Sequence, residues 1–317
     1  MGGTAPVRCS VAKVPLSGSS GPAAERRGLA VDAPASDTSC NAILNHQGRK
    51  WPHLHSVVAS LHSALSSVCS RPKPSDHAVK CRLCLQDREL RESHIIPEFL
   101  YRPGYDDKHR MEVLEGTGTK PALIQKGLRE RLLCEDCESL FANAYEDYFS
   151  RLWYQEKTLP IVADGPHWSL SGLDYGRFKL FHLSILWRAG ISSLAPFRRV
   201  FLGPTEDLLR QMLLNQDPGG RNDFQIFGVL LLLPGSVRVL DGFIASPTSQ
   251  VRNGHPLYMF VFGGCVWHYY ESSGQPNPLF AEIALSPAGY MTFPVRTLDK
   301  VTPLDRFFRE YVRHNSP

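Results

Sequence analysis

The stretch Leu132-Leu-Cys-Glu-Asp-Cys-Glu138 contains a Cys-x-x-Cys pair, and 49 residues separate it from an earlier pair in Cys81-Arg-Leu-Cys84. Zinc prefers four soft ligands in a tetrahedron, and a Cys-x-x-Cys turn places two thiolates on one side of the ion. The alternative, two unrelated redox or chance pairs, is disfavoured because both pairs flank coherent predicted secondary structure. We therefore expect one structural zinc ion (Zn²⁺) bound by Cys81, Cys84, Cys134 and Cys137.

A helix is predicted directly after the second pair. Apolar residues recur three and four apart there, at Phe141, Tyr145, Phe149 (or Tyr148) and Leu152. This spacing is typical of an amphipathic helix with one face on a core. Upstream, residues 111–115 predict a short strand, followed by a turn at Gly116 and Gly118.

The segment Ser93-His94-Ile95-Ile96-Pro97 lies between the two cysteine pairs. The order of Cys-x-x-Cys, this box, and a Cys-x-x-Cys-Glu helix resembles a variant of the HNH nuclease superfamily. The resemblance covers about residues 81–153. It implies a treble-clef zinc site in a strand-strand-helix module, and an endonuclease that hydrolyses phosphodiester bonds of nucleic acid, expected to be DNA.

The resemblance also implies roles for two residues. His94 matches the general base that takes a proton from the attacking water, while a divalent metal, Mg²⁺ or Mn²⁺, stabilises the scissile phosphate. Ser93 stands where the family often has an acidic metal ligand, and Glu138 stands where it usually has a histidine. A carboxylate is a hard oxygen donor, so Glu138 can replace that histidine, whereas Ser93 is a poorer ligand.

Three further residues are candidates for the missing metal ligand: Glu92, Asn143 and Glu146. In a regular α-helix, Glu146 lies roughly 80° around the axis from Glu138. This angle favours a supporting or structural role for Glu146.

A second function, from a different class, is a zinc-binding interaction module that has lost catalysis. Ser93, Glu138 and the charge balance are consistent with it, since residues 81–160 contain 12 Lys and Arg against 15 Asp and Glu. The net charge of +4 is too small to attract nucleic acid by itself. Contact with DNA would need a local cluster: Lys126, Arg129 and Arg131, or Arg198 and Arg199.

The chain after about residue 164 predicts a larger α+β domain of unknown role that sets the target or binds a protein partner. Residues 178–187 are apolar nearly all round, which predicts a buried helix, and Thr205 is a plausible N-cap for a helix through Leu214. Residues 224–240 predict a hairpin, and residues 257–270 predict buried strands. The last two apolar runs are too short to cross a bilayer, so no membrane partner is expected.

The remaining segments complete an α+β organisation. Residues 1–50 are rich in Gly, Ser, Ala and Pro, which predicts a disordered leader. Residues 51–78 predict one helix, from His53 to Cys69, and a linker. We expect residues 79–158 to form the zinc module and residues 164–317 to form the α+β domain, which ends in a helix at 306–313. The cysteine pattern and the absence of a signal peptide indicate the cytoplasm.

Other enzyme signatures are weak. The sequence has neither a phosphate-binding GxxxxGK[ST] loop nor a GxSxG elbow. Cys265 and His268 are three residues apart on a predicted strand, so they point to opposite faces and cannot form a catalytic dyad.

Overall fold

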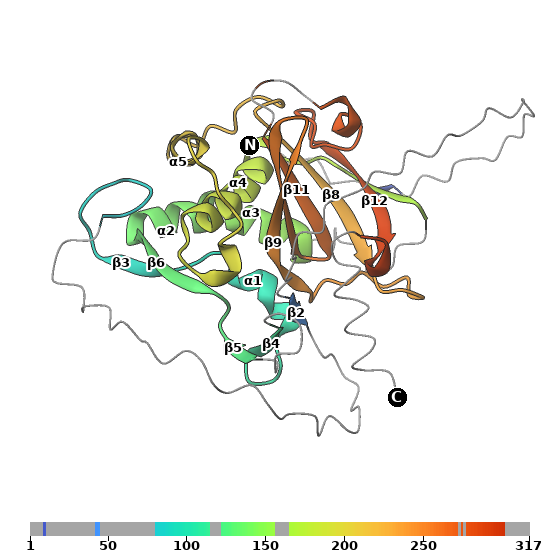
Figure 1. The fold of residues 1–317 in the computed structure, drawn as a ribbon, viewed down its shortest axis with the longest axis horizontal. Helices are drawn as coiled ribbons and strands as arrows, with labels where there is room; N and C mark the ends of the chain where they lie inside the picture. The colour runs from blue at the N-terminus through green and yellow to red at the C-terminus, as the bar shows by residue number, and fades with distance from the viewer. Residues whose placement is uncertain are drawn as a thin grey trace, which may run out of the picture.

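The computed structural model describes residues 80–114, 122–155, 165–271, 274 and 277–301, with two short strands, β1 (Cys9–Ser10) and β2 (Ala42–Leu44). Helices lie between a small two-stranded sheet and a large sheet (Figure 1). The predicted α+β class is confirmed. Strands β1 and β2 fall in the range predicted to be a disordered leader; the rest of that leader, the helix predicted over 53–69 and the one over 306–313 lie outside the described residues.

The large sheet has ten strands in the order β1-β7-β12-β8-β11-β10-β9-β2-β4-β5. Neighbouring strands run antiparallel within the described residues, except that β12 and β8 are parallel. Its longer strands are β4 (Arg110–Leu114), β5 (Ala122–Gln125), β7 (His167–Ser171), β8 (Phe224–Leu232), β9 (Ile244–Arg252), β10 (His255–Phe262), β11 (Cys265–Glu271) and β12 (Tyr290–Thr297).

The strands predicted over 257–270 form the hairpin β10–β11. Its two-residue turn is Gly263-Gly264, with φ of +58° and +77°. Both positions need the left-handed conformation that glycine adopts without steric cost, which favours a tight hairpin turn.

The hairpin predicted over 224–240 is formed only in part. Strand β8 pairs with β11 on one side and β12 on the other. The returning segment therefore contributes one isolated bridge, Leu232 to Val239. The local pattern of a strand, a turn and a second apolar run was outweighed by pairing with distant strands.

The helix predicted after the second cysteine pair spans residues 135–155. It consists of α2 (Glu135–Phe141), a π-helical turn η2 (Ala142–Glu146), α3 (Asp147–Ser150) and a second π-helical turn η3 (Arg151–Gln155). The predicted apolar stripe is confirmed as a core face, since Phe141, Tyr145, Phe149 and Leu152 are buried. The other helices are α1 (Glu98–Tyr101), α4 (Tyr175–Ile191), α5 (Thr205–Leu214) and the 3₁₀ turns η1 (Arg102–Gly104), η4 (Ala195–Phe197), η5 (Pro278–Phe280) and η6 (Leu298–Lys300).

Helix α4 is the buried helix that its nearly all-apolar run predicts, and it lies at the centre of the core. Residues 178–189 are all buried, and Asp174 caps its start by accepting a hydrogen bond from the Arg177 N–H at 3.0 Å. One hydrophobic cluster runs from Cys81 and the helix at 135–155 through α4 to Trp267 in the large sheet. The cysteine-containing segment and the later α+β segment thus share one core.

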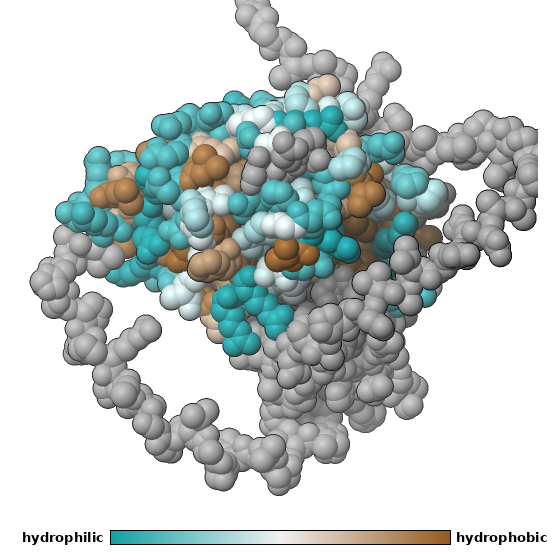
Figure 2. All heavy atoms as spheres, turned by 45° about the horizontal axis from the view of Figure 1, so that its top comes forward, coloured by the Kyte–Doolittle hydropathy of each residue, from teal (hydrophilic) through white to brown (hydrophobic). Residues whose placement is uncertain are grey.

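The surface is mostly hydrophilic on the face shown in Figure 2, where hydrophobic side chains form separate spots. In the part of the chain that the structure describes, no helix combines the length and the apolar character needed to span a membrane.

Candidate metal centre and the His94 site

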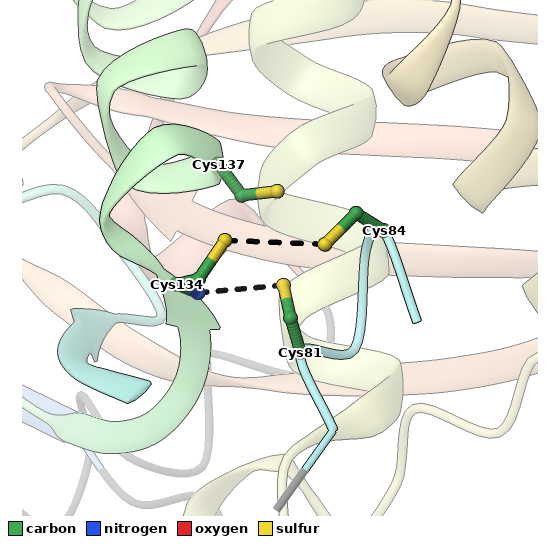
Figure 3. A group of neighbouring side chains, drawn as sticks. All are labelled: Cys81, Cys84, Cys134 and Cys137. Carbon is green, nitrogen blue, oxygen red and sulfur yellow. Dashed lines mark hydrogen bonds between the residues drawn. The ribbon is translucent and has the colours of Figure 1, made fainter. Parts of the chain in front are cut away.

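Four cysteine side chains converge on one point, as predicted. Cys81 and Cys84 come from a tight turn, and Cys134 and Cys137 come from the start of α2 (Figure 3). Their sulfur atoms all lie within 4.8 Å of one another, and the Sγ atoms of Cys84 and Cys134 are 3.9 Å apart. Sulfurs bound at about 2.3 Å to one tetrahedral zinc lie about 3.8 Å apart, whereas a disulfide requires about 2.05 Å. The residues therefore fit a Cys₄ metal site, for which zinc is a plausible ion.

Backbone hydrogen bonds build this site locally. The 81–84 turn closes with the Leu85 N–H donating to the Cys81 carbonyl at 2.9 Å, and Leu85 takes a left-handed φ of +61°. The Arg82 N–H donates to the Leu132 carbonyl at 2.9 Å, which joins the turn to the second pair. Helix α2 begins immediately after Cys134, so Cys137 lies in its first turn.

The thiols have unequal tendencies to ionise. Burial opposes ionisation of Cys81, but N–H groups of Cys134, Cys84 and Leu83 outweigh it and lower the Cys81 pKa; the Cys134 N–H donates to the Cys81 Sγ at 3.3 Å. Burial raises the pKa of Cys84 and of Cys137. A bound cation is what allows all four to be thiolates together.

A two-stranded antiparallel sheet, formed by strands with α1, β4 and β5 between them in the chain, lies beside the cysteine cluster and carries His94 at one end. Strand β3 (Leu90–His94) pairs antiparallel with β6 (Arg129–Cys134), so that Leu90 is opposite Cys134 and His94 is opposite Arg129. The His94 Nε2 lies 2.8 Å from the Lys126 carbonyl, in a turn where Lys126 has a φ of +62°. The β3–β6 sheet thus places the half-buried imidazole at the end opposite the sulfurs.

The surroundings of His94 favour the neutral imidazole. Burial lowers the His94 pKa below its ordinary value. The Lys126 carbonyl and the Glu98 carboxylate act in the opposite direction, while the charges of Arg129 and Arg188 lower the pKa further. In the neutral ring, the nitrogen facing Lys126 is the one that donates, and the lone pair is on Nδ1.

The two positions that depart from the HNH pattern have different environments. Ser93 is fully buried, and its Oγ accepts a hydrogen bond from the Leu133 N–H at 3.2 Å. Glu138 is half-buried, and its Oε1 is buried without a hydrogen-bond partner among the described residues. No hydrogen bond or ion pair joins Glu138 to His94 in the same set of residues.

Two further ligand candidates are engaged with arginines. Glu92 lies 3.9 Å from Arg129 and 3.8 Å from Arg131. Glu146 forms an ion pair of 2.8 Å with Arg188. The expected 80° offset of Glu146 from Glu138 assumed a regular α-helix, and the π-helical turn η2 changes that angle because it fits more residues into a turn.

No protein-family model matches this chain, and no curated protein or solved structure is detectably similar to it. The site is thus defined by its own geometry.

The sequence did not reveal the roles of Arg188 and Glu130, and it pointed to Lys126 only as a possible DNA contact. Arg188 reaches the backbone of His94 from α4, Lys126 holds the ring through its carbonyl, and Glu130 of β6 accepts hydrogen bonds from Ser192 and Ser193 at the end of α4. The signal that could have found Arg188 is a charged residue directly after a helical run that is apolar nearly all round, because a buried charge needs a partner.

Proposed function

We propose that residues 81–155 are a treble-clef zinc module of the HNH type, and that the protein hydrolyses phosphodiester bonds of nucleic acid. The order of the parts supports this: a Cys-x-x-Cys turn, two paired antiparallel strands with α1, β4 and β5 inserted between them, and a helix whose first turn carries the second cysteine pair. The sulfur cluster joins the turn to the helix and leaves no open ligand position, so a zinc ion there is structural.

The observation that carries the proposal is that His94 is held in one orientation and in surroundings that favour the neutral imidazole. A general base must be neutral near the working pH and must be held in one orientation. The Lys126 carbonyl, 2.8 Å from Nε2, orients the ring, and burial keeps the His94 pKa low. Nδ1 is then the atom that accepts the proton of an attacking water.

Glu138 is the proposed ligand of a catalytic Mg²⁺ or Mn²⁺; it directly follows Cys137 at the sulfur end of the β3–β6 sheet, so a bound substrate would have to span from there to His94 at the other end. The buried, unpartnered Oε1 of Glu138 is the kind of hard donor that such ions take. The ion, when bound, would stabilise negative charge on the scissile phosphate and the departing oxygen. Magnesium commonly uses one or two carboxylates, with water and substrate phosphates as the other ligands.

The β3–β6 sheet and the turn before β6 also offer positive charge next to His94. Arg129 faces His94 across the two strands, and Lys126 lies in the turn that holds the ring. Guanidinium and ammonium groups bind phosphate oxygens, which would place the backbone of a nucleic acid over the imidazole.

A non-catalytic zinc module remains the second candidate, and one observation favours it. Among the described residues, the cysteine cluster is the only group of three or more His, Cys, Asp and Glu side chains close enough to hold a metal. The β3–β6 sheet would then bind nucleic acid or a protein without cleaving it.

Incubation of the purified protein with supercoiled plasmid, single-stranded DNA and RNA separates the two functions. The nuclease proposal expects nicking that requires added Mg²⁺ or Mn²⁺ and that stops with EDTA, while zinc stays bound. Binding of one of these substrates without cleavage under any metal would support the interaction module.

A further inference from the structure

A buried arginine of α4 touches the residue proposed as the general base. Arg188 has a side chain only 1% exposed, and its Nη1 donates to the His94 carbonyl at 2.7 Å. Its Nε and Nη2 donate within α4 to the Ser184 carbonyl and Oγ, each at 3.2 Å. Its Nη2 also pairs with the Glu146 carboxylate at 2.8 Å.

These contacts satisfy a group that is costly to bury. An arginine stays charged inside a protein, so its guanidinium needs a counter-charge and several acceptors. Glu146, 22% exposed, supplies the negative charge, and the ring of Phe141 lies 5.3 Å from the guanidinium carbon. The direction of the planar guanidinium is fixed because it is bonded to His94, Ser184 and Glu146 together.

His94 is held at two points by this arrangement. Its backbone carbonyl, at the end of β3, accepts from Arg188, and its ring is held by the Lys126 carbonyl. The next residue, Ile95, donates its N–H to the Leu128 carbonyl at 3.1 Å. The backbone anchor therefore comes from α4, outside the zinc module, and the ring anchor comes from inside it.

We propose that Arg188, paired with Glu146, is a positioning residue that fixes His94 at the end of the β3–β6 sheet. The catalytic meaning of this role rests on the proposed nuclease function. A hydrophobic residue of similar size could fill the same core volume, but it could not bind the His94 carbonyl. The ion pair also joins the box at 93–97 to the helix at 135–155 through α4.

The charges that face His94 make its pKa a measurable test of the proposal. Glu98 of α1 raises the His94 pKa, whereas Arg129 of β6 and Arg188 of α4 lower it, and the Lys126 carbonyl faces the ring from the turn. Replacing Arg188 by glutamine removes a positive charge and leaves the Glu146 carboxylate unbalanced. Replacing Glu146 by glutamine leaves the arginine charge unbalanced. The two substitutions must therefore move the His94 pKa in opposite directions.

The test is an NMR titration of the full-length, zinc-loaded protein with ¹³C-labelled histidine, in which His94→Gln assigns the signal. We expect Arg188→Gln to raise the His94 pKa and Glu146→Gln to lower it. Arg188→Lys keeps the positive charge but lacks the planar guanidinium. Its His94 pKa should therefore be close to that of wild type, while the NMR signal of the neutral His94 ring should shift. An unchanged His94 pKa and signal in both Arg188→Gln and Glu146→Gln would overturn the proposal.

Arg210→Gln is the matched control. Arg210 of α5 also donates to a backbone carbonyl of the zinc module, that of Leu83 at 2.9 Å. It should leave the His94 pKa unchanged, and an equal shift would mean that any loosening of the module moves His94, which contradicts a specific role for Arg188. Should Arg188→Gln fail to fold, Arg188→Lys and Glu146→Gln decide the question.

A plasmid-nicking assay of the same variants separates this proposal from the nuclease proposal. If both hold, Arg188→Gln should nick roughly 10²-fold more slowly than Arg210→Gln at equal zinc content, because a misplaced base loses that order of rate. If wild type does not nick, the nuclease function fails, while the titration still shows whether Arg188 positions His94.

Discussion

The Sγ atoms of Cys84 and Cys134 lie 3.9 Å apart although 49 residues separate the two in the chain. We predict one tightly bound zinc per chain, because four thiols at this spacing, three of them buried and Cys84 half-buried, are thiolates together only around a cation. Cys137→Ser should lose the ion and lower the melting temperature by many degrees. Elemental analysis and thermal unfolding measure both effects.

Cys265→Ala serves as the control for this prediction. Cys265 is fully buried in β11, and burial raises its pKa, but it lies outside the cluster. Its loss should destabilise by packing alone and leave the zinc content at one per chain. The zinc site would be ruled out if the purified wild-type protein contained no metal and if adding zinc left its melting temperature unchanged.

Glu138→Gln should weaken the use of catalytic metal without affecting zinc. An amide oxygen is a poorer ligand for Mg²⁺ than a carboxylate, so the Mg²⁺ concentration for half-maximal nicking should rise. Glu135→Gln is the control, since that exposed acid in the same turn is paired with Arg91 at 2.6 Å. Equal metal requirements in the two variants would remove Glu138 from the site.

His182 should make the fold sensitive to acid. It is fully buried among aromatic rings, with Nδ1 3.1 Å from the Tyr269 hydroxyl, and burial lowers its pKa well below 6.5. The unfolded chain takes up a proton below about pH 6.5 and the folded chain does not, so stability is complete above that pH and falls as the pH drops.

Denaturant unfolding between pH 7.5 and 5.5, with zinc content checked at each pH, measures this effect. Below about pH 6.5 the free energy of unfolding should fall with pH less steeply for His182→Phe than for wild type. The two slopes should differ by about 1.4 kcal/mol per pH unit, because the variant lacks the one proton that His182 takes up on unfolding. His268, whose pKa burial lowers to about 4, should keep contributing in both proteins. Identical slopes would show that His182 is protonated in the folded state.

Substitution of two buried tryptophans tests whether a hydrogen bond from the helix at 135–155 to the large sheet stabilises the fold. The Trp153 Nε1 donates to the Gly263 carbonyl at 2.9 Å, whereas the Trp187 Nε1 has no hydrogen-bond partner among the described residues. Trp153→Phe should leave a buried carbonyl unpaired, at about 1–3 kcal/mol beyond the packing loss. Trp187→Phe loses only packing, so equal values in denaturant unfolding would argue against this stabilisation.

Features set by local chemistry were predictable from the sequence. Four cysteines in two pairs identified the cluster, the stripe from Phe141 to Leu152 identified the helix, and the apolar run before Arg188 identified the buried helix α4. Each follows from ligand number or from the period of apolar residues.

Features that depend on distant segments were not predictable. Strand β8 lost most of its expected hairpin partner because β11 and β12 occupy its sides. The π-helical turns altered the direction of Glu146, and its ion pair with Arg188 joins positions 42 residues apart. A sequence pattern records periodicity, but it does not say which charges meet once the chain is packed.

The most direct measurement of the central claim is the pH dependence of Mg²⁺-dependent plasmid nicking by wild type and His94→Ala. Wild type should gain rate as pH rises through a midpoint below 6.5, because burial lowers the His94 pKa. His94→Ala should be slower by roughly 10²–10⁴-fold and lose that midpoint, with unchanged zinc content and melting temperature. The exposed His167 provides the control variant, His167→Ala, which should nick like wild type. Equal rates in wild type and His94→Ala, or no nicking by either on DNA or RNA, would contradict the account.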